Sequence, residues 1–376
     1  MKIKMISFLL LFAMIVTILS FDCFDVHAYE TSSTSKGMVV LEGNTNTILY
    51  EKNKDDRLPM ASTTKLVTAI LAIENCENLD EEISVSDKAI GIEGTSIYLK
   101  QGESLTMREL LYGLILASGN DCAVAIAEHL GGEEYFVSMM NDFANSLNLT
   151  NTHFDNPHGL DSDSHYTSAY DLAVMTSYAL NNDFFVELIG TKRMVIDASD
   201  IYQARYLKNK DRLLFSEENC VGGKTGFTDN AGRCLVNVHD ENNMKIISVV
   251  LNCQPMFDEC QRLTNLALEE YCMKEFISPY NFVSNINISE SNKNEIGVIT
   301  INGYSLPILK CEEDKYEIIY DIPNVLTAPV KLNEEVGLVK LYKDNQLIYE
   351  DKLITIEDAE NNNIRYLIDN IMDKWF

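Results

Sequence analysis

The sequence predicts an α/β domain built on one antiparallel sheet with a helical insert, followed by a small all-β domain and a C-terminal amphipathic helix. Between residues 30 and 276, β-type runs stand at both ends and helical patterns fill the middle. This order indicates a sheet whose strands come from both ends of the segment and are covered by the helices. From 282 to 358 only short alternating strands occur, which is typical of a separate β-sandwich.

Residues 1–28 are predicted to be a cleaved signal peptide. Lys2 and Lys4 precede an apolar run over 5–21, and Val26-His27-Ala28 supplies the small residues that a signal peptidase accepts. A retained membrane anchor is the alternative, although the apolar run is short for a span. The mature chain is therefore expected outside the cytoplasm, in the cell envelope.

The composition argues against nucleic-acid binding. The chain carries 57 acidic and 30 basic residues, a net charge of −27, whereas a nucleic-acid surface needs a basic footprint. Of nine cysteines, Cys23 would leave with the signal peptide. The remaining even number is compatible with disulfides, but the cysteines are dispersed and several lie in apolar runs. We therefore favour buried thiols.

Within the first domain the elements are expected in a definite order. Residues 36–53 form two short strands around the Gly43-Asn44 turn. Apolar residues at helical spacing then predict helices over 66–73, 105–117, 121–132 and 168–180, with a polar loop at 151–166. Strands follow at 220–227, 232–240 and 244–252, and a helix over 259–276 closes the domain.

The tail has two parts. Strands are expected over 297–303, 316–322, 336–342 and 346–356. Residues 364–376 place apolar side chains, ending in Trp375, on one helical face and charged side chains on the other. This helix either lies in a membrane interface, giving peripheral contact with the outer face of the cytoplasmic membrane, or packs on its own domain.

Three short motifs in the first domain suggest nucleophilic chemistry: Ser62-Thr63-Thr64-Lys65, Ser118-Gly119-Asn120 and Lys224-Thr225-Gly226. Each is weak alone, since Ser33 and Lys36 repeat the first spacing and Ser146-Leu147-Asn148 resembles the second. Only the combination within one domain is informative.

Ser62 opens a helix, so Ser62 and Lys65 share one face and can touch. A serine hydroxyl is a poor nucleophile until a neighbour removes its proton, and Lys65 is the nearest group that can do so. Burial and a second cation such as Lys224 would lower the pKa of Lys65 toward the working range. The N–H groups at the helix start suit an oxyanion.

The other two motifs fit this chemistry, although each has a plain structural alternative. Ser118 can relay a proton and Asn120 can hold a substrate carbonyl, at a turn that Gly119 permits; otherwise Ser118 and Asn120 only cap the following helix. Lys224 and Thr225 can bind a substrate carboxylate on a strand that its glycines leave open to a ligand; otherwise they lie in an ordinary hairpin.

The three motifs in this order resemble those of the serine penicillin-recognising enzymes, specifically the low-molecular-mass penicillin-binding proteins that are D-alanyl-D-alanine carboxypeptidases. The blocks LPMASTTKL, ILASGNDCAVAIAEHLGG, THFDNPHGLD and VGGKTGFTDNAGRCLV extend the resemblance, and TAPVKLNEEVGLVKLYKDNQLIYEDKLIT resembles the C-terminal β domain of that family. The resemblance covers nearly the whole mature chain and implies a transpeptidase/β-lactamase-like α/β domain.

The resemblance also implies a reaction on peptidoglycan stem pentapeptides, with β-lactam antibiotics as covalent inhibitors. Ser62 would attack the carbonyl between the terminal D-alanines, with Lys65 as base and Ser118 as proton relay. Asn120 would anchor substrate, and Lys224, Thr225 and Gly226 would bind its carboxylate end. The backbone N–H groups of Ser62 and Phe227 would form the oxyanion hole. No metal or organic cofactor is implied.

One departure concerns the substrate carboxylate. Relatives often carry an arginine after the strand that follows the Lys-Thr-Gly motif, whereas this chain offers Arg262 several residues late, with Arg233 as a substitute.

The sequence leaves three alternative functions open: a class A β-lactamase, a zinc peptidase and a non-catalytic protein that binds stem peptides. A class A β-lactamase would need a deacylating glutamate that THFDNPHGLDSD lacks. A zinc peptidase is suggested only by His153, His158 and His165, without H-E-x-x-H spacing. A non-catalytic stem-peptide binder would not need every motif residue.

Overall fold

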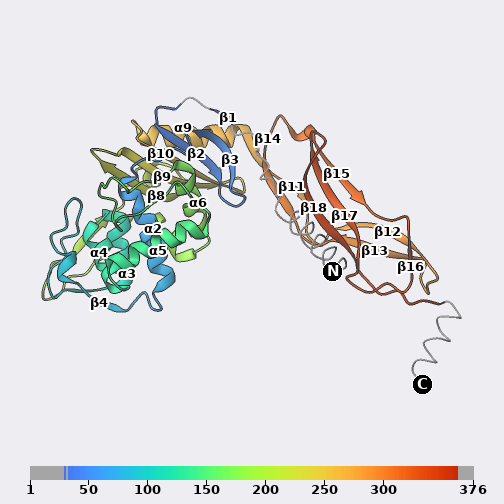
Figure 1. The fold of residues 1–376 in the computed structure, drawn as a ribbon, viewed down its shortest axis with the longest axis horizontal. Helices are drawn as coiled ribbons and strands as arrows, with labels where there is room; N and C mark the ends of the chain where they lie inside the picture. Colours follow the sequence, from blue (N-terminus) through green and yellow to red (C-terminus); the bar gives the residue numbers. More distant parts are fainter. Residues whose placement is uncertain (1–28, 31–32, 363–376) are drawn as a thin grey trace, which may run out of the picture.

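The computed structural model describes residues 29–30 and 33–362. The predicted signal peptide and the predicted C-terminal helix over 364–376 lie outside the described residues. Figure 1 shows an N-terminal domain of sheet and helices and a C-terminal domain of strands. The predicted fold class is confirmed.

A six-stranded sheet organises the N-terminal domain. Its strand order is β1-β3-β2-β10-β9-β8, so strands from both ends of the domain meet between β2 and β10, as the sequence predicts. All pairs are antiparallel except β1 with β3. The strands are β1 (Tyr29–Glu30), β2 (Gly37–Glu42), β3 (Thr47–Lys52), β8 (Cys220–Thr228), β9 (Gly232–Glu241) and β10 (Met244–Leu251).

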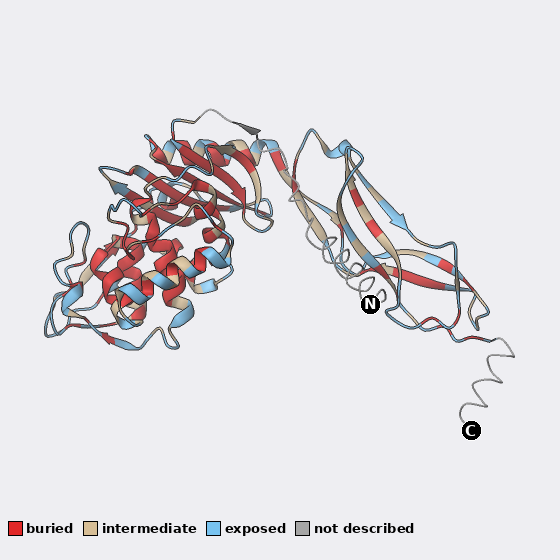
Figure 2. Cartoon of the chain, in the orientation of Figure 1, coloured by how far each residue is buried: buried red, intermediate tan, exposed pale blue. Residues whose placement is uncertain are grey.

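Two hydrophobic cores cover the two faces of this sheet (Figure 2). One lies between the sheet and most of the helices, and the other lies between the sheet and α9. Alternate residues of β9 point into different cores, since Cys234 and Val236 join the first and Leu235 joins the second. The helices are α2 (Lys65–Asn75), α3 (Met107–Tyr112), α4 (Asn120–His129), α5 (Glu133–Ser146), α6 (Ala169–Ala179), α7 (Asp183–Gly190), α8 (Leu213–Ser216) and α9 (Met256–Glu270).

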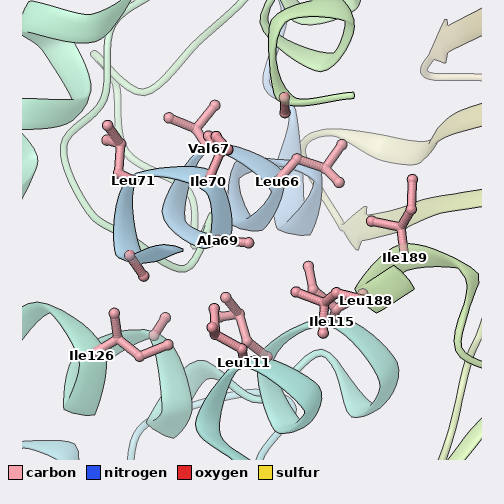
Figure 3. Packing of buried hydrophobic residues seen from close by; sticks show 14 of the residues in the cluster. Leu66, Val67, Ala69, Ile70, Leu71, Leu111, Ile115, Ile126, Leu188 and Ile189 are labelled. Atoms are coloured by element: carbon pink, nitrogen blue, oxygen red, sulfur yellow. The ribbon is translucent and has the colours of Figure 1, made fainter. Parts of the chain in front are cut away.

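Helix α2 is the central helix of the first core. Its residues from Lys65 to Ala72 are all buried, because other elements surround the helix. Figure 3 shows Leu66 and Ile70 among side chains of the neighbouring helices, including Leu111 and Ile115. A helix held on all sides gives fixed positions to the groups at its N-terminal end.

The predicted helix over 259–276 is wrong in its last six residues. Helix α9 ends at Glu270, and β11 (Tyr271–Ile277) pairs with β14 (Tyr304–Leu309) of the C-terminal domain. Tyr271 is buried, and its hydroxyl donates to the carbonyl of Leu49 at 3.1 Å. Pairing across the domain boundary therefore overrides a segment that helical propensity alone would continue.

Several elements had no prediction from sequence. Helices α5 and α7 and two small hairpins appear, β4 (Glu82–Ser84) with β5 (Ser104–Thr106) and β6 (Arg193–Ile196) with β7 (Arg205–Lys208). The predicted helix over 105–117 is α3 followed by a π-helical turn at Gly113–Ala117.

The C-terminal domain contains a six-stranded sheet in the order β15-β17-β18-β13-β12-β16 and the β11-β14 pair. Tyr304 of β14 stacks on Tyr349 of β18 with ring centroids 3.8 Å apart, so the two sheets pack face to face. The remaining strands are β12 (Phe282–Ser289), β13 (Glu295–Thr300), β15 (Tyr316–Asp321), β16 (Val325–Thr327), β17 (Glu335–Lys343) and β18 (Gln346–Thr355).

Two features concern the whole described chain. No helix within residues 29–30 and 33–362 has the length and apolar character needed to span a bilayer. The eight cysteines in the same part of the chain are unpaired; four of them are buried, as predicted, three are partly buried and Cys311 is exposed.

Candidate active site

Ser62 lies at the start of the central buried helix. Ala61–Thr64 form a 3-10 turn, η1, which leads directly into α2. The hydroxyl of Thr64 donates to the carbonyl of Ala61 at 2.8 Å and so tightens the turn. Lys65 Nζ donates to Ser62 Oγ at 2.8 Å, which is the contact that the i, i+3 spacing predicts.

Two other segments approach the Ser62 backbone closely. Ala61 adopts φ 49°, a left-handed conformation that side chains disfavour. A Cβ at Gly159 would lie 1.9 Å from the Ala61 oxygen and 2.9 Å from Ser62 N, and a Cβ at Gly226 would lie 3.1 Å from Ser62 N. Only glycines allow the loop and strand β8 to come this near.

We expect Gly159→Ala to lower kcat/KM by roughly 100-fold, because the new Cβ must displace the Ala61-Ser62 backbone by a large fraction of an ångström. Gly132→Ala is the matched control, since Gly132 has a similar φ of +100° and no atom within 4 Å of a built Cβ. The control should lose about 1–3 kcal/mol of stability, because only glycine readily adopts φ 100° with ψ 155°, and should keep its activity. Normal kinetics in Gly159→Ala would contradict this account.

Lys65 is fully buried and makes three hydrogen bonds. Its Nζ donates to Ser62 Oγ at 2.8 Å, to Asn120 Oδ1 at 2.7 Å and to the carbonyl of His158. Burial lowers the pKa of Lys65 well below its usual value, and the nearby charge of Lys224 lowers it further. A neutral amine at this place can accept the proton of Ser62.

The Ser118-Gly119-Asn120 motif forms the turn that leads into α4. Ser118, not Gly119, takes the left-handed conformation, with φ 64°. Gly119 is needed for space, because a Cβ there would lie 2.8 Å from Asp121 Oδ1 and 2.9 Å from Cys122 Sγ. Neither polar side chain caps α4, so the capping alternative does not apply.

Asn120 connects Lys65 to a loop that the sequence did not identify. Besides accepting from Lys65, the Asn120 side chain donates to the carbonyl of Glu93 at 2.6 Å. Its backbone N–H donates to the carbonyl of Thr95 at 2.7 Å. The segment around Gly94 therefore borders the motif, although no sequence signal pointed to it.

Lys224 joins the third motif to the second. It lies on β8 with 1% of its surface exposed, and its Nζ donates to Ser118 Oγ at 3.0 Å and to the carbonyl of Thr225 at 2.8 Å. Burial, together with the charge of Lys210, lowers the pKa of Lys224 to about 7. All three motifs thus meet at one place, with Ser62, Lys65 and Asn120 linked on one side and Ser118 and Lys224 on the other.

The two candidate arginines differ in position. Arg262 lies on α9, where its guanidinium pairs with Glu259 at 2.9 Å. Arg233 lies on β9 opposite Phe227 of β8, and its guanidinium carbon is 5.2 Å from the centre of the Phe227 ring. Arg233 is therefore the arginine beside the motif strand.

His153, His158 and His165, which suggested a zinc peptidase, instead belong to the loop over 151–166 that contacts Lys65 through the His158 carbonyl. His165 Nε2 contacts the hydroxyl of Thr64 at 2.9 Å, and Nδ1 of His153 contacts the carbonyl of Ser164 at 3.0 Å. Burial lowers the pKa of His158 to about 3 and that of His165 to about 4, so both are neutral. In the part of the chain that the structure describes, no three metal-ligating side chains gather.

The loop also carries a signal that sequence reasoning missed. Asn156 Oδ1 accepts from the backbone N–H of Gly159 at 2.7 Å, which closes the turn that aims the His158 carbonyl at Lys65. Asn three residues before Gly in Asn-Pro-His-Gly is a recognisable turn pattern.

A serine in contact with a buried lysine, at the border of an antiparallel sheet and a helical insert, defines a class of serine acyl-transfer enzymes that use lysine as the base. A profile of the D-alanyl-D-alanine carboxypeptidase family matches residues 25–255, and a profile of the C-terminal domain of penicillin-binding protein 5 matches residues 271–361. The chain belongs to the serine-type D-alanyl-D-alanine carboxypeptidase family, and the family resemblance predicted from the motifs is confirmed.

Individual relatives agree with this assignment. The chain is 30% identical to D-alanyl-D-alanine carboxypeptidase DacF of Bacillus subtilis over 356 residues, covering 92% of this chain and 91% of the relative. It is 28% identical to DacA of Escherichia coli, covering 91% and 89%. Penicillin-binding protein 5 of Haemophilus influenzae shares the fold, with a TM-score of 0.73, 24% identity, and coverage of 88% of this chain and 99% of that one.

Proposed function

We propose that Ser62 is the nucleophile that removes the terminal D-alanine from peptidoglycan stem pentapeptides. The observation that supports this most directly is the 2.8 Å contact between Ser62 Oγ and the amine of Lys65, whose pKa is lowered. Lys65 takes the hydroxyl proton as the bond between Ser62 Oγ and the carbonyl carbon forms. Ser62 and Lys65 are then the nucleophile and the base of the first step of the D-alanyl-D-alanine carboxypeptidase reaction.

The second half of acylation needs a proton at the leaving amine. Ser118 is the relay: its hydroxyl gives its proton to the amine and receives in its place the proton that Lys65 took from Ser62, while Lys224 Nζ donates to the hydroxyl at 3.0 Å and orients it. The C–N bond breaks and D-alanine leaves, and water later hydrolyses the ester on Ser62. Backbone N–H groups of Ser62 and Phe227 stabilise the oxyanion, as Gly226 brings β8 close to Ser62 N.

Substrate is held at both ends of the scissile bond. The Asn120 amide has a second N–H besides the one that donates to the Glu93 carbonyl, and this second N–H binds a substrate carbonyl. Lys224, Thr225 and Gly226 bind the terminal carboxylate. We assign Arg233 as the arginine that assists them, because it lies beside the motif strand while Arg262 is paired with Glu259.

The same proposal covers location and inhibition. Residues 1–28 direct export to the cell envelope, and residues 364–376 give peripheral contact with the outer face of the cytoplasmic membrane. β-Lactam antibiotics acylate Ser62 in place of the peptide.

The test combines product release with labelling. Purified protein should release free D-alanine from a peptide ending in D-Ala-D-Ala, and a fluorescent penicillin should stay on the peptide that contains Ser62 for long times. Rapid loss of the label with hydrolysed penicillin would favour a β-lactamase. Binding of the peptide without release of D-alanine would favour a non-catalytic binder.

A further inference from the structure

A hollow of about 790 Å³ lies on the side of the main sheet that faces α9. We call it the arginine hollow, because Arg212 and Arg233 both line it. Its other walls come from α8, from the start of α9 and from the residues just before α9. Arg233 of β9 shares this side of the sheet with Leu235, which belongs to the core between the sheet and α9.

The two guanidinium groups in the hollow have no polar partner. Within residues 29–30 and 33–362, neither group forms an ion pair or a hydrogen bond. Each lies against a ring instead: the guanidinium carbon of Arg212 is 5.3 Å from the centre of the Phe257 ring, and that of Arg233 is 5.2 Å from the centre of the Phe227 ring. A ring covers only one face of a guanidinium, so the N–H groups at its edge stay available to a carboxylate.

The other polar groups that line the hollow also suit an anion. Gln254 and Gln261 supply amide N–H donors. Asp258 lines the hollow as well, but it pairs with neither arginine. The described lining therefore carries two positive charges and one negative charge, in a chain whose net charge is −27. A local excess of positive charge attracts an anionic group.

The backbone on which both arginines stand is fixed. Asp211, which precedes Arg212, is 1% exposed, and its carboxylate accepts from Asn237 Nδ2 at 2.7 Å and from the backbone N–H of Leu213 at 3.0 Å. The carbonyl of Arg233 accepts from the backbone N–H of Cys253 at 2.8 Å. Binding a ligand here costs mainly side-chain freedom, because the backbone is already ordered.

Strand pairing places the hollow beside the carboxylate end of the proposed site. Thr225 pairs with Leu235 and Phe227 pairs with Arg233 in the β8-β9 ladder. Residues directly opposite each other share one face of a sheet, so all four lie on the side that faces α9. A substrate carboxylate bound by Thr225 and Arg233 therefore lies next to the arginine hollow.

We propose that the arginine hollow binds the side chain of the residue that the enzyme releases, and that it favours a side chain ending in a carboxylate. This inference rests on the proposed function, which places the terminal carboxylate of the substrate at Thr225 and Arg233. Arg212 lines the same hollow and pairs with the second carboxylate, because a guanidinium and a carboxylate match in charge and geometry.

The chemical steps stay those of the proposed function. The bond between Ser62 Oγ and the D-alanyl carbonyl carbon forms, and the C–N bond to the terminal residue breaks. The leaving nitrogen takes its proton from Ser118, and water then hydrolyses the ester on Ser62. A peptide ending in D-alanyl-D-glutamate thus yields D-glutamate and a peptide ending in D-alanine.

The test compares Nα,Nε-diacetyl-L-lysyl-D-alanyl peptides that end in D-alanine, D-glutamine or D-glutamate. D-Glutamine has the shape of D-glutamate without its charge. In the wild type, kcat/KM should be about five-fold higher for D-glutamate than for D-glutamine, the size of an exposed ion pair. Arg212→Gln should bring this ratio to about one. A salt concentration of about 1 M should also lower the ratio in the wild type, because salt screens exposed charges.

Two further variants isolate the effect of Arg212. Arg193→Gln removes an exposed arginine of β6 that does not line the hollow, and it should keep the wild-type ratio. Arg212→Glu reverses the charge and should release D-lysine faster than D-glutamate from the corresponding peptides.

The failures of the two proposals can be told apart. Release of D-alanine with no preference for D-glutamate over D-glutamine would overturn the inference and leave the proposed function standing. A preference that persists in Arg212→Gln, or that is lost equally in Arg193→Gln, would overturn it too. Release from none of the three peptides would reject the proposed function and this inference with it.

Discussion

Ser62→Ala should abolish D-alanine release and penicillin labelling, with kcat reduced on the order of 10⁴-fold or more. The expected loss is this large because the hydroxyl forms the covalent intermediate, and removing a nucleophile leaves only binding and oxyanion stabilisation. The fold should survive, since Lys65 keeps its bonds to Asn120 and His158. Steady-state kinetics and thermal unfolding measure the two effects.

Ser33→Ala is the matched control for this prediction. Ser33 and Lys36 have the same spacing as Ser62 and Lys65, but the Ser33 hydroxyl contacts Ser35 at 2.8 Å, outside the site. The control should release D-alanine at the normal rate. Full activity in Ser62→Ala would require a different nucleophile and would reject the central proposal.

Lys65→Met should lower the acylation rate roughly 10³-fold, the range expected when a general base is removed. Methionine fills the space of the aliphatic chain without placing a charge in the core. In the wild type, acylation should slow as the pH falls through the lowered pKa of Lys65, because the protonated amine cannot accept a proton. Stopped-flow measurement of penicillin acylation follows both effects.

Stability against pH provides an independent check of the same residue. The folded pKa of Lys65 lies below the usual 10.5, so between these two values the unfolded chain binds one more proton than the folded one. The free energy of unfolding therefore rises with pH across that window. Lys65→Met should show a smaller rise, and the exposed control Lys36→Met should keep the wild-type rise. An identical rise in Lys65→Met would mean that the pKa of Lys65 is not lowered.

The site could be predicted from sequence where local geometry carries the chemistry. Ser62 and Lys65 are three residues apart at a helix start, so their contact follows from helix geometry. Strands β2, β3, β8, β9 and β10 could be predicted because the sequence shows β-type runs separated by turn residues. Further sequence segments over most of the chain resemble those of the D-alanyl-D-alanine carboxypeptidases, and this resemblance predicted the reaction.

Other features depend on contacts between distant segments. The His158 carbonyl reaches Lys65 across 93 residues, and Lys224 reaches Ser118 across 106. The strand over Tyr271–Ile277 exists because β14 pairs with it. Local propensity contains none of this information, which is why the helix prediction failed there.

The sequence by itself therefore determined five strands of the main sheet, the three motifs and the family, because each is written in residue spacing or in local periodicity. The tertiary structure alone decided which side chains share one low-dielectric space. Burial of Lys65 and Lys224 near each other sets their protonation, and the carbonyl of Glu93 accepts from the side chain of Asn120 across 27 residues. Desolvation and long-range hydrogen bonding depend on what surrounds a group, and only the folded chain defines those surroundings.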